Sequence, residues 1–233
     1  MQLYTYMSVN HELETFILKH NILLLDLLPK LSENTKRSIL SDLKNQYQTT
    51  NLSIKNDTLS IKNDTLYIFT DGGCKRNGNQ NSKAAYSVFF TENQDSPFFQ
   101  FNTSQHFTEE PTNNRAELSG ILYIFKTIYE NKTLFQNKHI TICTDSMYSI
   151  NCIEKWSKNW LLNNWKNSKG KDVKNKELIE KILNYHADLQ FNITFKHIFS
   201  HTAAPSDQNT LSYHLWFGNN KVDENINKLL NQK

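Results

Sequence analysis

The chain has 233 residues, 38% of them hydrophobic, and a net charge of +3 at pH 7, which is too small to argue for nucleic-acid binding by itself. The mean hydropathy is −0.63 and no apolar run approaches the roughly 20 residues that cross a bilayer, which excludes a membrane-spanning class, and the N-terminus lacks the pattern of a signal peptide. Three cysteines without metal-ligand spacing indicate free thiols in a reducing compartment, so we expect an intracellular protein, in cytoplasm or nucleus, without a membrane partner.

Residues 10–48 have the apolar periodicity of two helices. Apolar residues from Leu13 to Leu25 are spaced for one helical face, Pro29 breaks the run, and a second periodic run ends near Leu43. Residues 1–50 are therefore predicted to form a small helical N-terminal extension. Its role and any protein partner are left open.

A seven-residue repeat follows this extension. Residues 52–58 and 59–65 have the same sequence, Leu-Ser-Ile-Lys-Asn-Asp-Thr. The Asn-Asp content favours a flexible tether over a strand. We therefore predict a linker at residues 51–64 and a single domain at residues 65–233.

The second part of the chain alternates between strand and helix patterns. Strands are predicted at 66–70, at 84–90 and between 98 and 107, and because no helix separates them they should be antiparallel neighbours. Helical periodicity then marks 114–129, a helix from Ser146, 176–187 and 219–230, with further strands at 139–144 and 191–198. This order predicts an α/β fold with a five-stranded mixed sheet, three antiparallel strands and then two parallel ones, flanked by helices.

Four acidic residues lie at the ends of predicted strands or near the starts of predicted helices. Asp71, in Thr-Asp-Gly-Gly-Cys, and Asp145, in Cys-Thr-Asp-Ser, follow strands, whereas Glu117 and Asp223 lie near the starts of predicted helices. Singly, each fits a turn, a helix cap or a surface acid. Together they offer hard oxygen ligands suited to Mg²⁺ or Mn²⁺ rather than Zn²⁺. Two such ions about 4 Å apart are the usual device for in-line cleavage of a phosphodiester.

In order and local sequence, these segments resemble ribonuclease H of the cellular type, or type 1, from near Leu66 onward. The resemblance implies the ribonuclease H-like fold and an endonuclease that hydrolyses the RNA strand of RNA–DNA hybrids, leaving 5′-phosphate and 3′-hydroxyl ends. It implies two Mg²⁺ ions, with Mn²⁺ as a substitute, bound by four catalytic carboxylates: Asp71, Glu117, Asp145 and Asp223. It also implies that the protein is a monomer whose partner is the hybrid.

A histidine follows the last predicted strand. His201, in Phe-Ser-His-Thr, resembles the catalytic mobile-loop histidine of this family. The loop predicted at 202–217 is longer than is usual, and His214 within it is a rival for the role. Asn220 stands where many relatives carry Glu, which concerns contacts around the metal site rather than the four acids.

The segment 154–181 interleaves lysines with Trp156, Trp160 and Trp165, and it resembles the basic handle of type 1 ribonucleases H. Such a handle gives salt-dependent, sequence-independent affinity. The resemblance makes Trp165 the DNA-side aromatic contact and implies DNA or phosphate contacts from Thr112, Trp160, Trp165, Lys166, Lys169, Lys171, Lys174 and Asn175. Glu110 stands where relatives often have Arg, which predicts a weaker phosphate pocket.

RNA is distinguished from DNA by its 2′-hydroxyl groups. The resemblance implies contacts with these groups from Cys74, Asn77, Asn113 and Asn114. Two other functions remain in view: a hybrid-binding module on the same fold that does not cut, and a different nuclease of this fold, such as a transposase, integrase or resolvase. The complete set of four acids argues against the first, and the basic handle argues against the second.

Overall fold

The computed structural model describes residues 65–107, 109–136, 138–189 and 191–232, together with Ser32 and Ser38. The predicted helical extension (apart from these two serines) and the linker at 51–64 lie outside the described residues. From Thr65 onward, the described residues belong to one compact unit. No helix in these described ranges is long and apolar enough to cross a bilayer.

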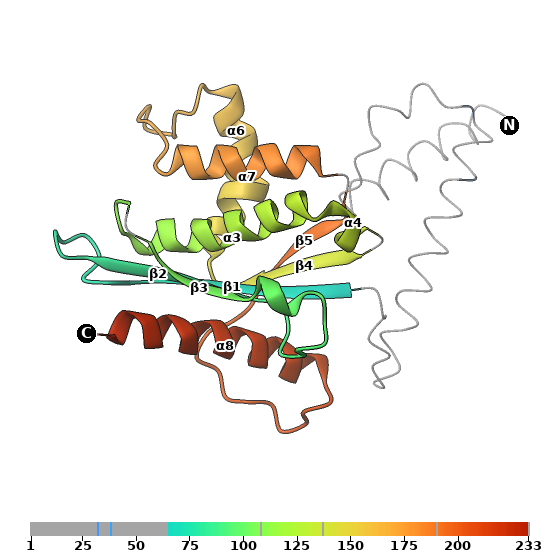
Figure 1. Ribbon diagram of the computed structural model, residues 1–233. Helices are drawn as coiled ribbons and strands as arrows, with labels where there is room; N and C mark the ends of the chain where they lie inside the picture. The colour runs from blue at the N-terminus through green and yellow to red at the C-terminus, as the bar shows by residue number, and fades with distance from the viewer. Residues whose placement is uncertain are drawn as a thin grey trace, which may run out of the picture. The chain divides into compact units, whose positions relative to one another are not determined.

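Five strands form one mixed sheet in the order β3-β2-β1-β4-β5 (Figure 1). They are β1 (Thr65–Lys75), β2 (Lys83–Phe89), β3 (Thr103–Phe107), β4 (His139–Thr144) and β5 (Ile193–His197). β1 pairs antiparallel with β2, and β2 with β3, whereas β4 runs parallel to both β1 and β5. The predicted sheet of three antiparallel and two parallel strands is confirmed.

Helices cover both faces of this sheet. The main ones are α3 (Asn113–Glu130), α7 (Lys176–Asp188) and α8 (Leu211–Asn231), and the shorter ones are α4 (Lys132–Phe135), α5 (Met147–Ile150) and α6 (Ser157–Leu162), with a π-helical segment at Asn151–Trp156 and a 3₁₀ turn at Phe99–Phe101. Figure 1 shows α3 and α7 on one side of the sheet and α8 on the other. Side chains alternate accordingly along β1, because Ile68 joins the core under α3 and Phe69 joins the core under α8.

The register of β1 and β4 places two of the predicted acids side by side. Phe69 pairs with Cys143 in the parallel ladder. Asp71 and Asp145 each lie two residues beyond this pair, so they reach the same level of the sheet. The prediction that Asp71 ends its strand is wrong. The pairing of β1 with β2 continues past Asp71 to Lys75 opposite Lys83.

The last helix begins earlier than predicted. α8 starts at Leu211, not near Asn219, and the Thr210 side chain caps it by accepting a hydrogen bond from the backbone N–H of Tyr213 at 3.2 Å. Leu215 and Phe217 pack against the core under α8, which stabilises these added turns. Asp223 therefore lies in the middle of the helix, and the segment predicted as a loop at 202–217 is helical from Leu211 onward.

Two glycines let α3 lie unusually close to β1. A Cβ atom at Gly72 would lie 2.2 Å from the backbone N of Glu117, and one at Gly120 would lie 2.1 Å from Oγ1 of Thr70. Neither position has room for a side chain. This close approach brings Glu117, on α3, down to the level of Asp71 on β1.

Candidate functional site

Three of the four predicted acids converge. Asp71, Glu117 and Asp145 offer carboxylate oxygens that all lie within 4.8 Å of one another. β1 supplies the first, α3 the second and the residue directly after β4 the third. The convergence follows from the strand register and from the glycine contacts that hold α3 against β1.

Burial and mutual repulsion dominate the electrostatics of this cluster. Burial, together with the charge of Asp145, raises the pKa of Asp71 to about 7, even though the backbone N–H of Gly72 donates to its Oδ1 at 2.7 Å. Burial and the charges of Asp71 and Asp145 raise the pKa of Glu117 well above its ordinary value. Glu117 is 4% exposed, and its Oε2 has no hydrogen-bond partner within the described residues. A buried acceptor without a donor, inside a group of acids, fits a divalent cation bound by oxygen ligands.

Asp223 lies beside the cluster rather than within it. Its charge contributes to the raised pKa of Asp71, and the two residues line one small cavity of about 30 Å³. The Asn227 amide donates to Oδ1 of Asp223 at 3.2 Å. The structure thus places the fourth acid next to Asp71, on the opposite side of the sheet from Glu117.

The two candidate histidines differ in their surroundings. His201, with a left-handed backbone (φ 55°), lines the same small cavity as Asp71 and Asp223. His214, on α8, instead packs its ring 5.5 Å from the rings of both Tyr67 and Phe69, and burial lowers its pKa. The geometry favours His201 for a role at the cluster.

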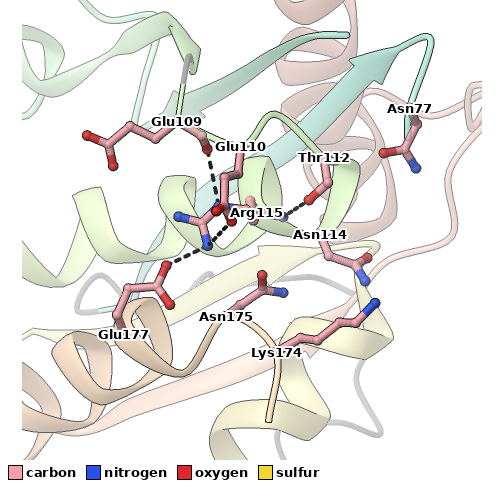
Figure 2. Close-up of a pocket in the computed structure, with 9 residues that line it drawn as sticks. All are labelled: Asn77, Glu109, Glu110, Thr112, Asn114, Arg115, Lys174, Asn175 and Glu177. Carbon is pink, nitrogen blue, oxygen red and sulfur yellow. Dashed lines mark hydrogen bonds and ion pairs between the residues drawn. The ribbon is translucent and has the colours of Figure 1, made fainter. Parts of the chain in front are cut away.

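A larger pocket of about 910 Å³ opens at the N-termini of α3 and α7 (Figure 2). Its lining combines residues predicted for the two strands of a hybrid: Asn77 and Asn114 for RNA, and Thr112, Lys174 and Asn175 for DNA or phosphate. Two helix N-termini favour an anion here.

The other two residues predicted to contact RNA lie beside this pocket. The Asn113 backbone N–H donates to Oδ1 of Asn77 at 3.4 Å, and the Cys74 thiol donates to the carbonyl of Pro111 at 3.5 Å. Sequence reasoning therefore grouped residues that the structure brings together.

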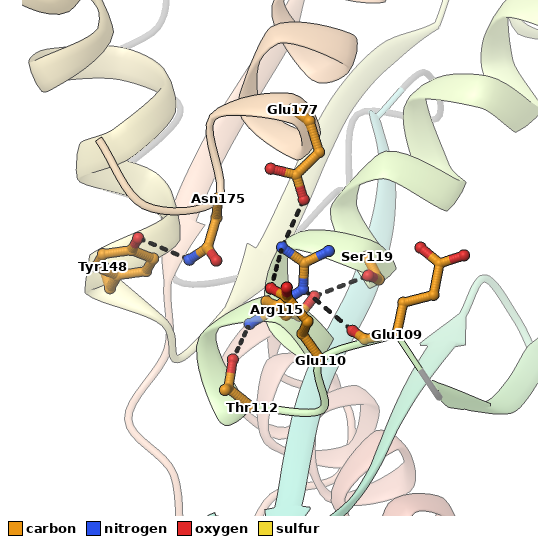
Figure 3. A network of polar contacts seen from close by, with 8 residues as sticks. All are labelled: Glu109, Glu110, Thr112, Arg115, Ser119, Tyr148, Asn175 and Glu177. Atoms are coloured by element: carbon orange, nitrogen blue, oxygen red, sulfur yellow. Dashed lines mark hydrogen bonds and ion pairs between the residues drawn. The ribbon is translucent and has the colours of Figure 1, made fainter. Parts of the chain in front are cut away.

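The pocket is organised by an arginine that the sequence analysis did not select. Arg115 is 7% exposed and forms an ion pair with Glu177 at 2.5 Å, while its Nε donates to the carbonyl of Glu109 at 3.2 Å (Figure 3). Glu110 lies 4.0 Å from the same guanidinium. The charge of Arg115 is thus largely neutralised by acids. Lys174 is the other cationic residue that lines the pocket.

The handle contains a ladder of tryptophans. The ring centroids of Trp156 and Trp160 are 5.9 Å apart, and those of Trp160 and Trp165 are 6.1 Å apart. Trp165 is only 7% exposed, and Val173 donates a backbone hydrogen bond to its carbonyl. This burial argues against the prediction that Trp165 is the DNA-side contact, because a buried indole offers no face to a sugar.

Trp160 remains half-buried and borders a cavity of about 400 Å³ shared with Lys166 and Asn167. Lys169, Lys171 and Lys174 are exposed, whereas Lys166 pairs with Asp172 at 2.6 Å. The handle therefore presents Trp160 and several lysines on its surface.

Comparisons with a family model and with curated proteins point to the same family. The RNase H family model matches residues 63–226. Ribonuclease H1 of Homo sapiens is 36% identical over 124 residues, which are 53% of this chain and 40% of the human protein. Ribonuclease H of Clostridium botulinum is 34% identical over 116 residues, which are 49% of this chain and 70% of the bacterial protein.

Among solved structures, the protease-reverse transcriptase of prototype foamy virus has a TM-score of 0.51 at 15% identity, covering 72% of this chain and 21% of that one. This likeness concerns the fold alone. The chain spans less than half the length of the human relative that it matches.

Proposed function

Because the chain belongs to the ribonuclease H family, we propose that it is a metal-dependent endonuclease that hydrolyses the RNA strand of RNA–DNA hybrids, leaving 5′-phosphate and 3′-hydroxyl ends. The observation that carries this proposal is the cluster of Asp71, Glu117 and Asp145 with its orphaned buried oxygen. We place the activity in residues 65–233, with residues 1–50 and 51–64 as an appended extension and its linker.

The acids would hold the metal. Asp71, Glu117 and Asp145, together with Asp223, would bind two Mg²⁺ ions, or Mn²⁺ in their place. Such ions, when bound, supply a nucleophilic hydroxide at neutral pH and stabilise the charge on the departing oxygen. Burial and mutual repulsion favour the protonated form of Asp71 and Glu117, and metal binding requires both groups to lose these protons. Acid pH should therefore oppose metal binding.

His201 would serve the same reaction from the cavity that it shares with Asp71 and Asp223. An imidazole in this place can accept a proton from water or donate one to the leaving 3′ oxygen. Its loop is held by Trp216 on α8, whose indole N–H donates to the carbonyl of Thr202 at 2.9 Å.

Hybrid recognition would divide between the large pocket and the handle. Asn77 and Asn114, with the adjoining Cys74 and Asn113, would read the 2′-hydroxyl groups that mark RNA. The remaining contacts would position the other strand through its phosphates and sugars. They are Thr112, Trp160, Lys166, Lys169, Lys171, Lys174 and Asn175, and Trp160 replaces Trp165 as the aromatic contact.

The test is cleavage of a labelled RNA–DNA hybrid, with duplex RNA and duplex DNA as controls, in Mg²⁺ and in Mn²⁺. We expect metal-dependent cutting of the RNA strand of the hybrid alone, and its loss in Asp145→Asn. Tight hybrid binding without cutting in either metal would refute the nuclease and favour a hybrid-binding module. Retained cutting in Asp145→Asn would refute the assignment of the acids.

A further inference from the structure

Tyr148 is close in sequence to the carboxylate cluster and in contact with the pocket, although neither the cluster nor the pocket lining includes it. It lies three residues after Asp145 in α5, a helix that Ser146 caps by accepting from the backbone N–H of Ser149 at 3.3 Å. Its hydroxyl accepts a hydrogen bond from Nδ2 of Asn175 at 3.0 Å (Figure 3). Its ring meets that of Trp156 edge-on, with centroids 6.1 Å apart.

Asn175 has an unusual conformation for its place in the chain. It occupies the N-cap position of α7, where an asparagine side chain ordinarily accepts a hydrogen bond from the helix. Here the side chain makes no cap bond, and the backbone is left-handed (φ 59°, ψ 24°). The amide is directed by Tyr148 instead, while the residue lines the large pocket. The hydroxyl of Tyr148 therefore determines where this amide lies.

The same pocket is tied to the cluster from its other side. Glu177, in the first turn of α7, pairs with Arg115, and Arg115 stands two residues before Glu117 on α3. The start of α7 is thus held by one contact to α5, whose N-cap Ser146 directly follows Asp145, and by another to the helix that carries Glu117. These contacts fix the pocket relative to the carboxylates.

We propose that Tyr148 is a positioning residue that orients Asn175, so that a backbone phosphate held in the large pocket sets the register of the hybrid on the carboxylate cluster. The proposal rests on the proposed function and extends it to a residue that touches neither metal nor scissile bond. Phosphate contacts carry register rather than sequence, because the spacing of phosphates along a strand is regular. A DNA-strand phosphate held in the pocket then defines which bond of the paired RNA strand faces the acids.

The charge state of Tyr148 is compatible with this role. Burial, with a contribution from Cys152, raises the pKa of Tyr148 to about 12, and even a tyrosine with its ordinary pKa is neutral at physiological pH. A neutral hydroxyl can accept from the Asn175 amide without adding a negative charge to a pocket that already contains Glu109, Glu110 and Glu177.

The test compares Tyr148→Phe, which removes only the hydroxyl, with Asn175→Gly, which removes the amide and tolerates the left-handed backbone. Tyr123→Phe is the matched control, because the Tyr123 hydroxyl also makes one hydrogen bond, which it donates to the carbonyl of Phe101 at 3.2 Å, outside the pocket and the cluster. Hybrid affinity is measured in EDTA, where no metal-dependent cutting occurs. The probes are a fully charged hybrid and a set in which one DNA-strand phosphate at a time is a neutral methylphosphonate.

We expect Tyr148→Phe to weaken hybrid binding roughly two- to tenfold, as for one lost hydrogen bond. It should cause no further loss in an Asn175→Gly background, because the two residues act as a unit. In the wild type, one methylphosphonate position should reduce affinity, and this sensitivity should disappear in both variants. A merely structural tyrosine would not change the response to a single phosphate.

Two results would overturn this proposal alone, and a third would overturn it together with the proposed function. One is a wild type that binds hybrids while Tyr148→Phe behaves like Tyr123→Phe, which would leave the proposed function intact. The other is an additive loss in the double variant, with the sensitive phosphate unchanged. A wild type that binds no hybrid would refute the proposed function and this inference together.

Discussion

Replacing Asp71 by Asn should abolish cleavage and, at the same time, stabilise the metal-free protein. The carboxylate is held in a buried cluster beside Asp145 and Glu117, where its charge is unfavourable without a cation. Asn has nearly the same shape, and its side-chain oxygen can still accept from the backbone N–H of Gly72. The substitution therefore removes a charge with little change in packing.

The magnitude follows from linkage. The pKa of Asp71 is about 7 in the folded protein against an ordinary 3.8, so between these pH values the folded state binds more protons than the unfolded state. The free energy of unfolding consequently falls as pH rises through this range. At about 1.4 kcal/mol per pKa unit, the full loss above pH 7 is about 4 kcal/mol. This is an upper limit for the gain from Asp71→Asn, because Glu117 and Asp145 still repel each other.

The assay is urea unfolding in EDTA at about pH 8 and about pH 5, with Asp95→Asn, an exposed carboxyl on a turn, as the control. Asp71→Asn should exceed the wild type by up to about 4 kcal/mol at the higher pH and by under about 2 kcal/mol at the lower one. Added Mg²⁺ should then stabilise the wild type more than the variant, by mass action. A variant that is no more stable than the wild type at pH 8, or a gain that does not depend on pH, would refute the reasoning.

Three further predictions concern two residues of the large pocket and the loop that carries His201. Glu110→Gln should tighten hybrid binding about two- to threefold at low salt and less at high salt, since it removes a screened negative charge from the pocket; titration at two salt concentrations measures this. Lys174→Ala should weaken binding and reduce the slope of log affinity against log salt by about one, the share of a single phosphate contact. Trp216→Phe should lower kcat roughly three- to tenfold with KM nearly unchanged, because it releases the Thr202 carbonyl and the loop that holds His201.

Each of these has a result that would contradict it. Equal affinity of Glu110→Gln and wild type at every salt concentration would show that this carboxylate does not face the bound anion. Lys126→Ala, on the exposed face of α3, should leave the salt slope unchanged, so an equal change there would mean a non-specific charge effect. If Trp216→Phe lowers kcat by the same factor in a His201→Ala background as in the wild type, the hydrogen bond from Trp216 to Thr202 does not act through that histidine.

The sheet and its acids were predictable because they depend on local patterns. The strands have short apolar runs, the connections between the first three lack helices, and Asp71 and Asp145 follow β-branched or aromatic residues. Parallel pairing then brings these two acids together without any further information. The start of α8 was not predictable in this way. The aromatic stretch before Phe217 reads as a loop until its packing against Phe69 is known.

The burial of Trp165 in the handle and the ion pair of Arg115 in the pocket were not predictable from local patterns, for two different reasons. Asn164 and Trp165 both have left-handed backbones (φ 48° and 58°), and Trp165 is buried. Residues other than glycine rarely adopt such angles, so nothing in their spacing announces the turn. Arg115 and Glu177 are far apart in sequence, and only the packing of α7 on α3 reveals that they form an ion pair.

The close contact of α3 with β1 at Gly72 and Gly120 has a consequence for a genetic screen. Under the proposed function, substitution of an acid should leave a folded protein without activity, whereas any side chain at Gly72 or Gly120 would collide with the backbone of Glu117 or with Thr70. A screen for lost activity would therefore recover both kinds of allele. Only protein abundance would separate them, because the acid alleles would accumulate and the glycine alleles would be cleared.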